Sequence, residues 1–248
     1  MKILVCISSV PDTTSKINFS ADGKSFDKTG VQFVINPHDE FALTRAVWFQ
    51  EKQGANITVV TIGDASVEPV IRKALAIGAD QAIRVNAEAE DSLYVAKQIA
   101  KIAQEGGYDL ILTGRESIDY NAGAVPGLVA SILKMPFVNG CVKLEVEGST
   151  LTATREIDGG KQNVSASLPA VIAAQKGLVS EDELKIPNMR GIMQARTKPL
   201  TVVEPEAVNT NLKAISFEAP PARSSVKLFD VSDVASLVRA LNQEAKVI

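Results

Sequence analysis

The sequence has few of the side chains from which metal and redox-thiol sites are built. It contains two cysteines and one histidine among 248 residues. Cys6 and Cys141 lie far apart, which excludes CxxC redox chemistry and a cysteine-ligated zinc or iron–sulfur site. The single histidine, His38, excludes most metal sites and Ser-His-Asp triads, and its simplest interpretation is an exposed residue without a function. We therefore expect no metal site.

Long apolar runs, excess positive charge and aromatic residues are also scarce. No stretch approaches the roughly 18 uninterrupted apolar residues that a membrane span needs. A net charge of −3 leaves no basic patch for nucleic acid. With 5% aromatic residues, the core must be built from valine, isoleucine, leucine and alanine. The chain opens on a strand-like run with no targeting peptide before it, so we expect a cytoplasmic protein without direct membrane insertion and without nucleic acid as a partner.

The first half of the chain alternates apolar runs with helical patterns. Four runs are apolar on both faces and predict parallel strands, at Ile3–Ile7, Ile57–Ile62, Gln81–Val85 and Asp109–Thr113. The first helix between them begins with Asn36 as N-cap and Pro37 at its first position, and the next two end at Gly78 and Gly106. This order predicts an α/β fold with a doubly wound, mostly parallel, Rossmann-like sheet.

Two further segments depart from this alternation. A polar insertion spans Asp12–Gly30 and contains a predicted hairpin. After Pro136, apolar and charged residues alternate, with turns at Gly148-Ser149 and Asp158–Gly160, which predicts an antiparallel hairpin extension. The apolar run Leu168–Ala174 then returns to the main sheet.

The chain divides into an α/β domain over residues 1–196 and an extended C-terminal arm over residues 197–248. Prolines from Thr197 onward oppose regular structure. The arm ends in a predicted amphipathic helix capped by Asp230. Its apolar face consists of Val231, Val234, Leu237, Val238 and Leu241. Such a stripe docks either on its own domain or on another chain, and the residue pattern alone favours its own domain.

The stretch Thr113–Gly127 carries a weak signal for a phosphate-binding loop. It follows a predicted strand, precedes a predicted helix at Leu128–Leu133, and its small residues let backbone N–H groups approach an anion. Neither GxGxxG nor GxxxxGK[ST] is present. A plain turn that needs glycine for close packing of the helix on the sheet explains the same residues. The phosphate-binding loop and the plain turn both stay open.

Several segments converge on one end of the predicted sheet. Ligands of doubly wound sheets bind beyond the carboxyl ends of the strands. Those ends are Cys6–Ser9, Ile62–Asp64 and Gly114–Asp119, and the helix start Asn36–Asp39 lies beside them. This convergence makes an adenine-nucleotide pocket about as probable as a plain turn. Asp119 would accept from a ribose hydroxyl or cap the next helix, and no catalytic residue is identified.

A longer signature lies in the predicted antiparallel extension. The segment Ala153–Val164, followed by Leu168–Ala173, resembles the signature of the electron transfer flavoprotein β-subunit. Segments along essentially the whole chain follow the same family order, namely Lys2–Asp12, Ile35–Pro37, Arg72–Asp80, Gly114–Asp119 and Ile186–Asn188.

This resemblance implies a β-subunit of a heterodimeric electron carrier and not an enzyme. In the family, the α-subunit holds most of the redox FAD, and the β-subunit supports it and binds a structural AMP. The heterodimer carries electrons from acyl-CoA and related dehydrogenases of fatty acid oxidation to a quinone oxidoreductase. By family position, the AMP pocket comprises Cys6, Asn36, Pro37, His38, Asp39, Ile62, Gly63, Gly114, Ser117, Asp119, Asn121, Ala122, Gly123, Ala124 and Val125.

The resemblance also assigns residues to the flavin and to the α-subunit. Thr13 and His38 match positions where the β-subunit approaches the flavin, although the aromatic residues common there are absent. Glu156, preceded by Arg155, matches a carboxylate that pairs with an arginine of the mobile flavin domain. In the family the C-terminal arm wraps the α-subunit, which reverses the earlier preference and places the apolar stripe in trans.

A recognition loop at about residues 183–196 is implied as well. Ile186, with Pro187 and Asn188, matches the apolar anchor that enters partner dehydrogenases. Its basic rim would be Lys185, Arg190, Arg196 and Lys198.

One departure from the family pattern leaves a choice of ligand. The phosphate loop usually carries polar side chains where this chain has Ala124 and Val125. Val125 and Gly114-Arg115 resemble bifurcating members, which hold a second FAD in the AMP site and oxidise NADH. The acidic and hydroxyl residues of those members are replaced by Asn121 and Ala122, so AMP is favoured and bifurcation is the alternative. A homodimeric stress-type nucleotide-binding protein is a third option, against which the signature argues.

Overall fold

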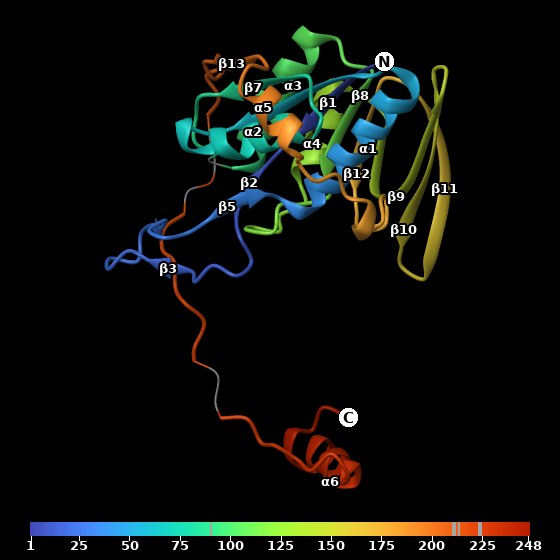
Figure 1. Cartoon of the computed structure of the whole chain (residues 1–248). Helices are drawn as coiled ribbons and strands as arrows, with labels where there is room; N and C mark the ends of the chain where they lie inside the picture. Colours follow the sequence, from blue (N-terminus) through green and yellow to red (C-terminus); the bar gives the residue numbers. More distant parts are fainter. Residues whose placement is uncertain (90, 210–211, 213, 223–224) are drawn as a thin grey trace.

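The core of the molecule is a nine-stranded sheet (Figure 1). The computed structural model describes residues 1–248 apart from 90, 210–211, 213 and 223–224. The strand order is β11-β10-β9-β12-β8-β1-β6-β7-β13. Their bounds are β1 (Lys2–Cys6), β6 (Asn56–Ile62), β7 (Gln81–Val85), β8 (Leu110–Gly114), β9 (Phe137–Glu147), β10 (Thr150–Ile157), β11 (Gly160–Ser167), β12 (Ala170–Ala174) and β13 (Leu200–Val203). The four strands predicted for the first half are confirmed within one residue at each end.

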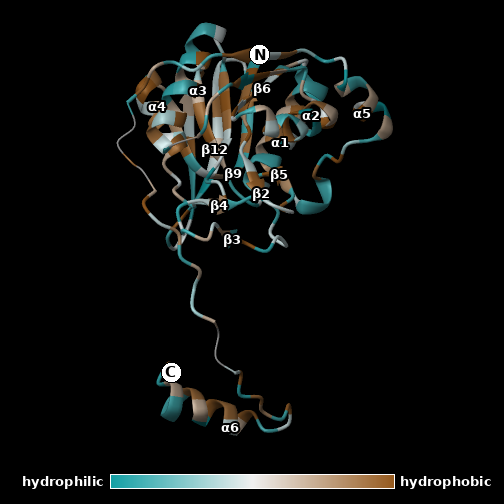
Figure 2. Cartoon of the chain, turned by 90° about the vertical axis from the view of Figure 1, so that its left-hand side faces the viewer, coloured by the Kyte–Doolittle hydropathy of each residue, from teal (hydrophilic) through white to brown (hydrophobic). Residues whose placement is uncertain are grey.

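Helices cover both faces of the parallel part of the sheet, which confirms the doubly wound fold. Their bounds are α1 (Pro37–Gln53), α2 (Glu68–Ile77), α3 (Ser92–Gly106), α4 (Val125–Leu133), α5 (Met189–Ala195) and α6 (Val234–Arg239). One apolar cluster joins the sheet to α1 and α2, and a second joins its other face to α3 and α4. The strands are strongly apolar (Figure 2).

The chain order places a switch point beside β1. From β1 the chain continues to β6 and β7 on one side, whereas β8 and β12 lie on the other side. All of these neighbours are parallel, so their carboxyl ends lie along the same edge. Doubly wound sheets bind ligands at such a switch point, and the place beyond the carboxyl ends of β1 and β8 is here called the Asp39 crevice.

The antiparallel extension and the predicted insertion hairpin are both present. β9, β10 and β11 form a meander at one edge, and β12 lies between β8 and β9, parallel to both. In the insertion, β3 (Asn18–Phe19) pairs with β4 (Phe26–Asp27). A second small sheet pairs β2 (Ser9–Pro11) with β5 (Phe33–Ile35).

The prediction that residues from Thr197 onward lack regular structure is wrong for β13. This strand pairs in parallel with β7 at the edge of the sheet. Pro199 lies directly before it and supplies only its carbonyl oxygen, which accepts from the Ala82 N–H at 2.9 Å. Proline is tolerated there because no backbone donor is required of it.

Beyond β13, the described residues of the arm contact the body at two places before the arm projects away. The backbone of Glu206 exchanges two hydrogen bonds with the buried side chain of Gln98, at 2.9 and 2.8 Å. Phe217 stacks on Phe19 with ring centroids 5.3 Å apart, and its N–H donates to the Gly23 carbonyl at 2.7 Å. The arm therefore follows its own domain as far as the insertion hairpin.

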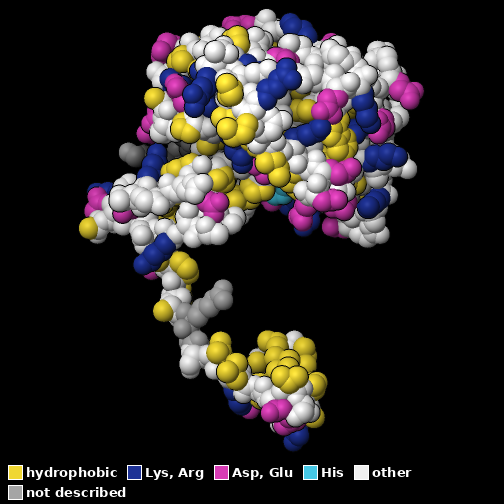
Figure 3. Space-filling model, viewed as in Figure 1, with side chains coloured by type: hydrophobic (Ala, Val, Ile, Leu, Met, Phe, Trp, Pro, Cys, Tyr) yellow, Lys and Arg dark blue, Asp and Glu magenta, His cyan; other side chains and the backbone are white. Residues whose placement is uncertain are grey.

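The arm ends in α6, which continues as a π-helical segment over Ala240–Ala245. Its cap is Asp233, whose carboxylate accepts from the Ser236 N–H, so the prediction of Asp230 as cap is wrong. Asp230 instead closes a local turn by accepting from Ser232. The apolar stripe is exposed, with Val231 at 95% and Val234 at 61%, and apolar side chains gather on this terminal helix (Figure 3).

No helix in the described part of the chain is long and apolar enough to cross a bilayer. Among the same residues, no group of three or more histidine, cysteine, aspartate or glutamate side chains is placed to hold a metal ion.

Candidate functional site

The crevice at the carboxyl ends of β1 and β8 is organised around Asp39, in the first turn of α1. Its carboxylate is buried and accepts from the Ser8 N–H after β1 and from the Gly114 N–H at the end of β8, both at 2.7 Å. Burial raises the pKa of Asp39 to about 7, although these hydrogen bonds favour the charged form. One carboxylate thus ties together the two strand ends that flank the switch point.

Gly114 lets this carboxylate approach the backbone. A Cβ atom at this position would lie 2.4 Å from Asp39 Oδ1 and 2.6 Å from His38 Cβ. Because both contacts are far inside van der Waals distance, a side chain at position 114 would displace the start of α1.

Asn36 lies at the N-cap position of α1, but its side chain does not cap the helix. Its amide nitrogen donates to the Glu116 carbonyl at 2.9 Å, and its oxygen accepts from the Ile118 N–H at 3.2 Å. His38 Nδ1 lies 3.2 Å from the same Glu116 oxygen and donates to it when that nitrogen is protonated. The expectation of an exposed histidine is therefore wrong, because His38 is half-buried against the loop after β8.

The loop between β8 and α4 contains two residues with positive φ. Asn121 and Gly123 have φ angles of +50° and +59°, and Ala124 is right-handed at −92°. A left-handed residue followed by a right-handed one, as at Gly123-Ala124, can turn adjacent N–H groups to one side. Residues 119–123 are exposed, whereas Val125 begins α4. Asp119 accepts from the Tyr120 N–H and does not cap α4, so its capping alternative is removed.

The remaining pocket residues lie around the same edge. Cys6 is buried at the end of β1, and burial together with Asp39 raises the pKa of its thiol above the usual value. Gly63 follows β6, and its carbonyl accepts from buried Arg84 at 3.0 Å. Arg84 also pairs with Glu68 at 3.3 Å. Sequence reasoning missed Arg84, and its only signal was a cation inside an apolar strand.

A second set of predicted residues lies on β10. Glu156 is exposed, and its carboxylate accepts from Gln175 Nε2. The Gln175 oxygen in turn accepts from Arg115 Nη1 at 3.0 Å. Gln175 therefore links the loop after β8 to Glu156. Arg155 is instead engaged with Gln162 of β11, at 2.8 Å.

Thr13 is exposed at the start of the polar insertion. In the described part of the chain, no hydrogen bond or ion pair joins Thr13 to the residues of the Asp39 crevice.

The predicted recognition loop presents an exposed apolar surface, here called the docking ridge, which comprises Ile186, Met189, Ile192 and Met193. Ile186 is 82% exposed, and the other three lie on α5. The expected basic rim is only partly free for a partner. Lys185 pairs with Glu51 at 2.7 Å, and Lys198 donates to two carbonyl oxygens of the body.

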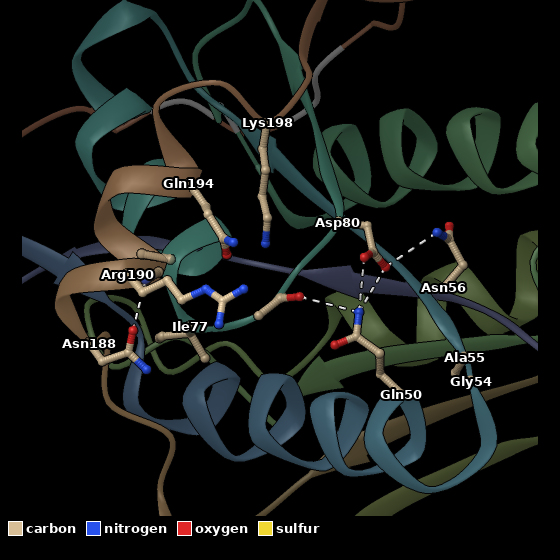
Figure 4. A pocket seen from close by; sticks show the side chains of 13 residues that line it. Gln50, Gly54, Ala55, Asn56, Ile77, Asp80, Asn188, Arg190, Gln194 and Lys198 are labelled. Atoms are coloured by element: carbon tan, nitrogen blue, oxygen red, sulfur yellow. Dashed lines mark hydrogen bonds between the residues drawn. The ribbon is translucent and has the colours of Figure 1, made fainter.

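A cavity of about 660 Å³ lies beneath α5, apart from the Asp39 crevice (Figure 4). Asp80 and Gln50 face it from the body, and Arg190, Gln194 and Lys198 face it from the α5 segment (Figure 4). Asn56 and Asp80 adjoin the amino ends of β6 and β7. This cavity is therefore at the opposite edge of the sheet from Asp39.

Comparisons with known proteins agree over nearly the whole chain. Residues 24–208 match the family described as electron transfer flavoprotein domain. The chain is 38% identical over 239 residues to the electron transfer flavoprotein subunit beta of Syntrophomonas wolfei, covering 95% of this chain and 93% of that protein. This chain belongs to the electron transfer flavoprotein β-subunit family. The corresponding subunit of Bacillus subtilis is 34% identical with full coverage of both chains, and the human one is 32% identical with 98% coverage of both.

Membership of the electron transfer flavoprotein β-subunit family makes this chain a flavoprotein component of electron transport. The matched region contains Asp39, the loop after β8, the β9–β11 meander and the docking ridge, but not β1 with Cys6 and Ser8. It ends before α6, whereas the alignments to the relatives from Bacillus subtilis and human continue through nearly the whole chain.

Proposed function

We propose that this chain is the β-subunit of a heterodimeric electron transfer flavoprotein and binds AMP as a structural ligand in the Asp39 crevice. The observation that carries the proposal is the closure of the switch point by Asp39, which positions the loop after β8 next to the start of α1. Small residues and the positive φ angles of Asn121 and Gly123 are compatible with a phosphate at 121–125. Backbone donors need no particular side chain, so Ala124 and Val125 are compatible with AMP.

The exposed arm is proposed to bind the α-subunit. Four stripe residues of the arm, Val231, Val234, Leu237 and Val238, are each more than a third exposed. Exposed apolar surface of this extent is costly in water and is typical of an obligate interface. In this proposal the arm begins after residue 196, β13 attaches its start to the sheet, and α6 buries its stripe on the α-subunit.

The redox FAD belongs mostly to the α-subunit in this proposal, and the β-subunit lines its surroundings. Thr13 and His38 are the residues proposed to face the flavin. His38 is held by the Glu116 carbonyl beside the crevice. Glu156, held by Gln175, is proposed to pair with the mobile flavin domain, with Arg155 beside it.

The docking ridge is proposed to bind acyl-CoA and related dehydrogenases, whose electrons the heterodimer passes to a quinone oxidoreductase. Ile186 is the proposed anchor, followed by Pro187 and Asn188. Three more apolar side chains extend the surface along α5. An isolated cluster of exposed apolar residues on an otherwise polar rim favours insertion into an apolar pocket of a partner.

A bifurcating, NADH-oxidising complex with a second FAD in place of AMP is the alternative. Val125 and the Gly114-Arg115 pair favour it. Arg115, however, is already engaged by Gln175 and Glu116, at 3.0 and 3.3 Å. AMP remains the preferred ligand.

The proposed division of labour is tested by expressing the chain alone and together with its α-subunit. The isolated chain should be colourless, because it lacks most of the FAD site, and the co-expressed pair should co-purify with a flavin spectrum. Stoichiometric visible flavin on the isolated chain would contradict the proposal.

A further inference from the structure

Most of the docking ridge lies on α5, a short helix with little buried surface. α5 has seven residues, and Ala195 is its only buried one. Helices this short are unstable in isolation. The cavity of about 660 Å³ separates one side of α5 from α1 and from the start of β6 (Figure 4). The position of the ridge therefore depends on a few contacts between α5 and α2.

The first of these contacts is made by Gly191. A Cβ atom at this position would lie 2.3 Å from the carbonyl oxygen of Ala76, so the backbone of α5 rests directly on α2. The Gly191 N–H donates to the side chain of Asn188 at 2.8 Å, which caps the start of α5 (Figure 4). The Ala76 carbonyl oxygen belongs to the backbone and cannot rotate away as a side chain could. No larger residue therefore fits at position 191 unless α5 moves.

The second contact consists of two cationic side chains, each of which donates hydrogen bonds to the segment that carries the other. Arg72 of α2 donates through Nη1 to the carbonyl oxygens of Ala195 and Lys198, at 2.7 and 2.9 Å. Lys198, just after α5, donates through Nζ to the carbonyl oxygens of Leu75 and Ala79, at 2.9 and 2.6 Å. Each cation thus satisfies free carbonyls at the C-terminal end of the other helix, where positive charge is favourable.

We propose that Arg72, Gly191 and Lys198 form a seat that fixes the orientation of the docking ridge, and that they are positioning residues for the docking of a dehydrogenase. This inference rests on the proposed function of the ridge. A ridge held in one orientation loses less conformational freedom when a partner binds it. Without the seat, α5 would settle into the cavity beneath it and turn Met193 and Ile192 away from the partner.

If the seat fixes the ridge, its loss should raise the KM of the dehydrogenase for the heterodimer and leave kcat nearly unchanged. The experiment uses the co-expressed heterodimer and an acyl-CoA dehydrogenase of the source organism, with the rate of flavin reduction measured against heterodimer concentration. Gly191→Ala and Arg72→Gln should each raise the KM for the heterodimer about tenfold and leave kcat within about twofold. Arg72→Lys should restore most of the loss, because an ammonium group also donates to carbonyl oxygens.

The matched control is Gly160→Ala, at a glycine where an added Cβ atom meets nothing within 4 Å. It should leave the KM unchanged, and FAD and AMP contents should be equal in all variants. Ile186→Ala and Met193→Ala test the ridge itself. If they raise the KM but Gly191→Ala and Arg72→Gln do not, the seat is wrong and the ridge stands. If none of the four changes the KM, the docking function of the ridge fails. A fall in FAD content or kcat at unchanged KM would show a general folding effect and overturn the seat.

Discussion

A methyl group at position 114 is the smallest change that should open the nucleotide crevice. Gly114→Ala places a Cβ atom 2.4 Å from Asp39 Oδ1 and 2.6 Å from His38 Cβ. Relief requires the start of α1 to move away from β8. That movement breaks the 2.7 Å hydrogen bond from the Gly114 N–H to the Asp39 carboxylate.

The size of the effect follows from two costs that one displacement incurs. Loss of a hydrogen bond to a charged group costs about 1.5–3 kcal/mol, and overpacking of a tight site costs about 1–3 kcal/mol. The free energy of unfolding should therefore fall by about 2.5–6 kcal/mol. For a chain of this size, the thermal midpoint should fall by roughly 5–24 °C. AMP should be largely lost, because the loop after β8 no longer lies against Asn36 and His38.

The assay is thermal unfolding of the heterodimer at fixed concentration, with the nucleotide content measured on the same preparation. Gly127→Ala is the matched control, since its Cβ atom would lie at an ordinary 3.5 Å from the Phe137 ring. Alanine within α4 should also raise stability by up to about 1 kcal/mol. A Gly114→Ala heterodimer with an unchanged midpoint and full AMP would refute the argument that this close approach builds the crevice.

Three further predictions follow from separate contacts. Burial raises the pKa of Asp39 to about 7, above its unfolded value, so its contribution to stability is present at about pH 4 and is lost as pH rises through 7. The thermal midpoint of the wild type should thus fall between about pH 4 and pH 7 relative to that of Asp39→Asn. Midpoints of the two proteins that change with pH in parallel would contradict the raised pKa of Asp39. Gln175→Ala frees Glu156 and should slow electron transfer about two- to fivefold at unchanged AMP content, through the loss of about 0.5–1 kcal/mol of positioning; unchanged stopped-flow rates would remove this role. Ending the chain at Phe229 deletes the apolar stripe, and each lost side chain removes about 1.5–3 kcal/mol of burial. Sedimentation should then show a heterodimer weakened at least about a hundredfold, and wild-type affinity would contradict docking of the stripe in trans.

Local signals predicted the parallel core well. Pro37 and Gly78 mark the start of α1 and the end of α2 where the structure has them, because helix ends depend on neighbouring residues. Alternation after Pro136 predicted the meander for the same reason. The return of Leu168–Ala174 to the sheet followed from its continuous apolar character.

Contacts between distant segments could not be predicted in this way. The side chain of Asn36 was expected to cap its own helix, but it binds the backbone about 80 residues away. β13 forms although it follows Pro199, because its pairing with β7 depends on a neighbour that no local pattern reveals. Arg72 and Lys198 belong to segments with no sequence relation, and only the fold brings them together.

The central claim is that the crevice at the switch point holds AMP and that this β-subunit supports a single redox flavin. The most direct test is mass spectrometry of the nucleotides released by acid from the co-expressed heterodimer, with FAD and AMP each quantified against protein. One FAD and one AMP per heterodimer are expected. Two FAD and no AMP would contradict the claim and would identify the bifurcating alternative, with NADH as the electron donor.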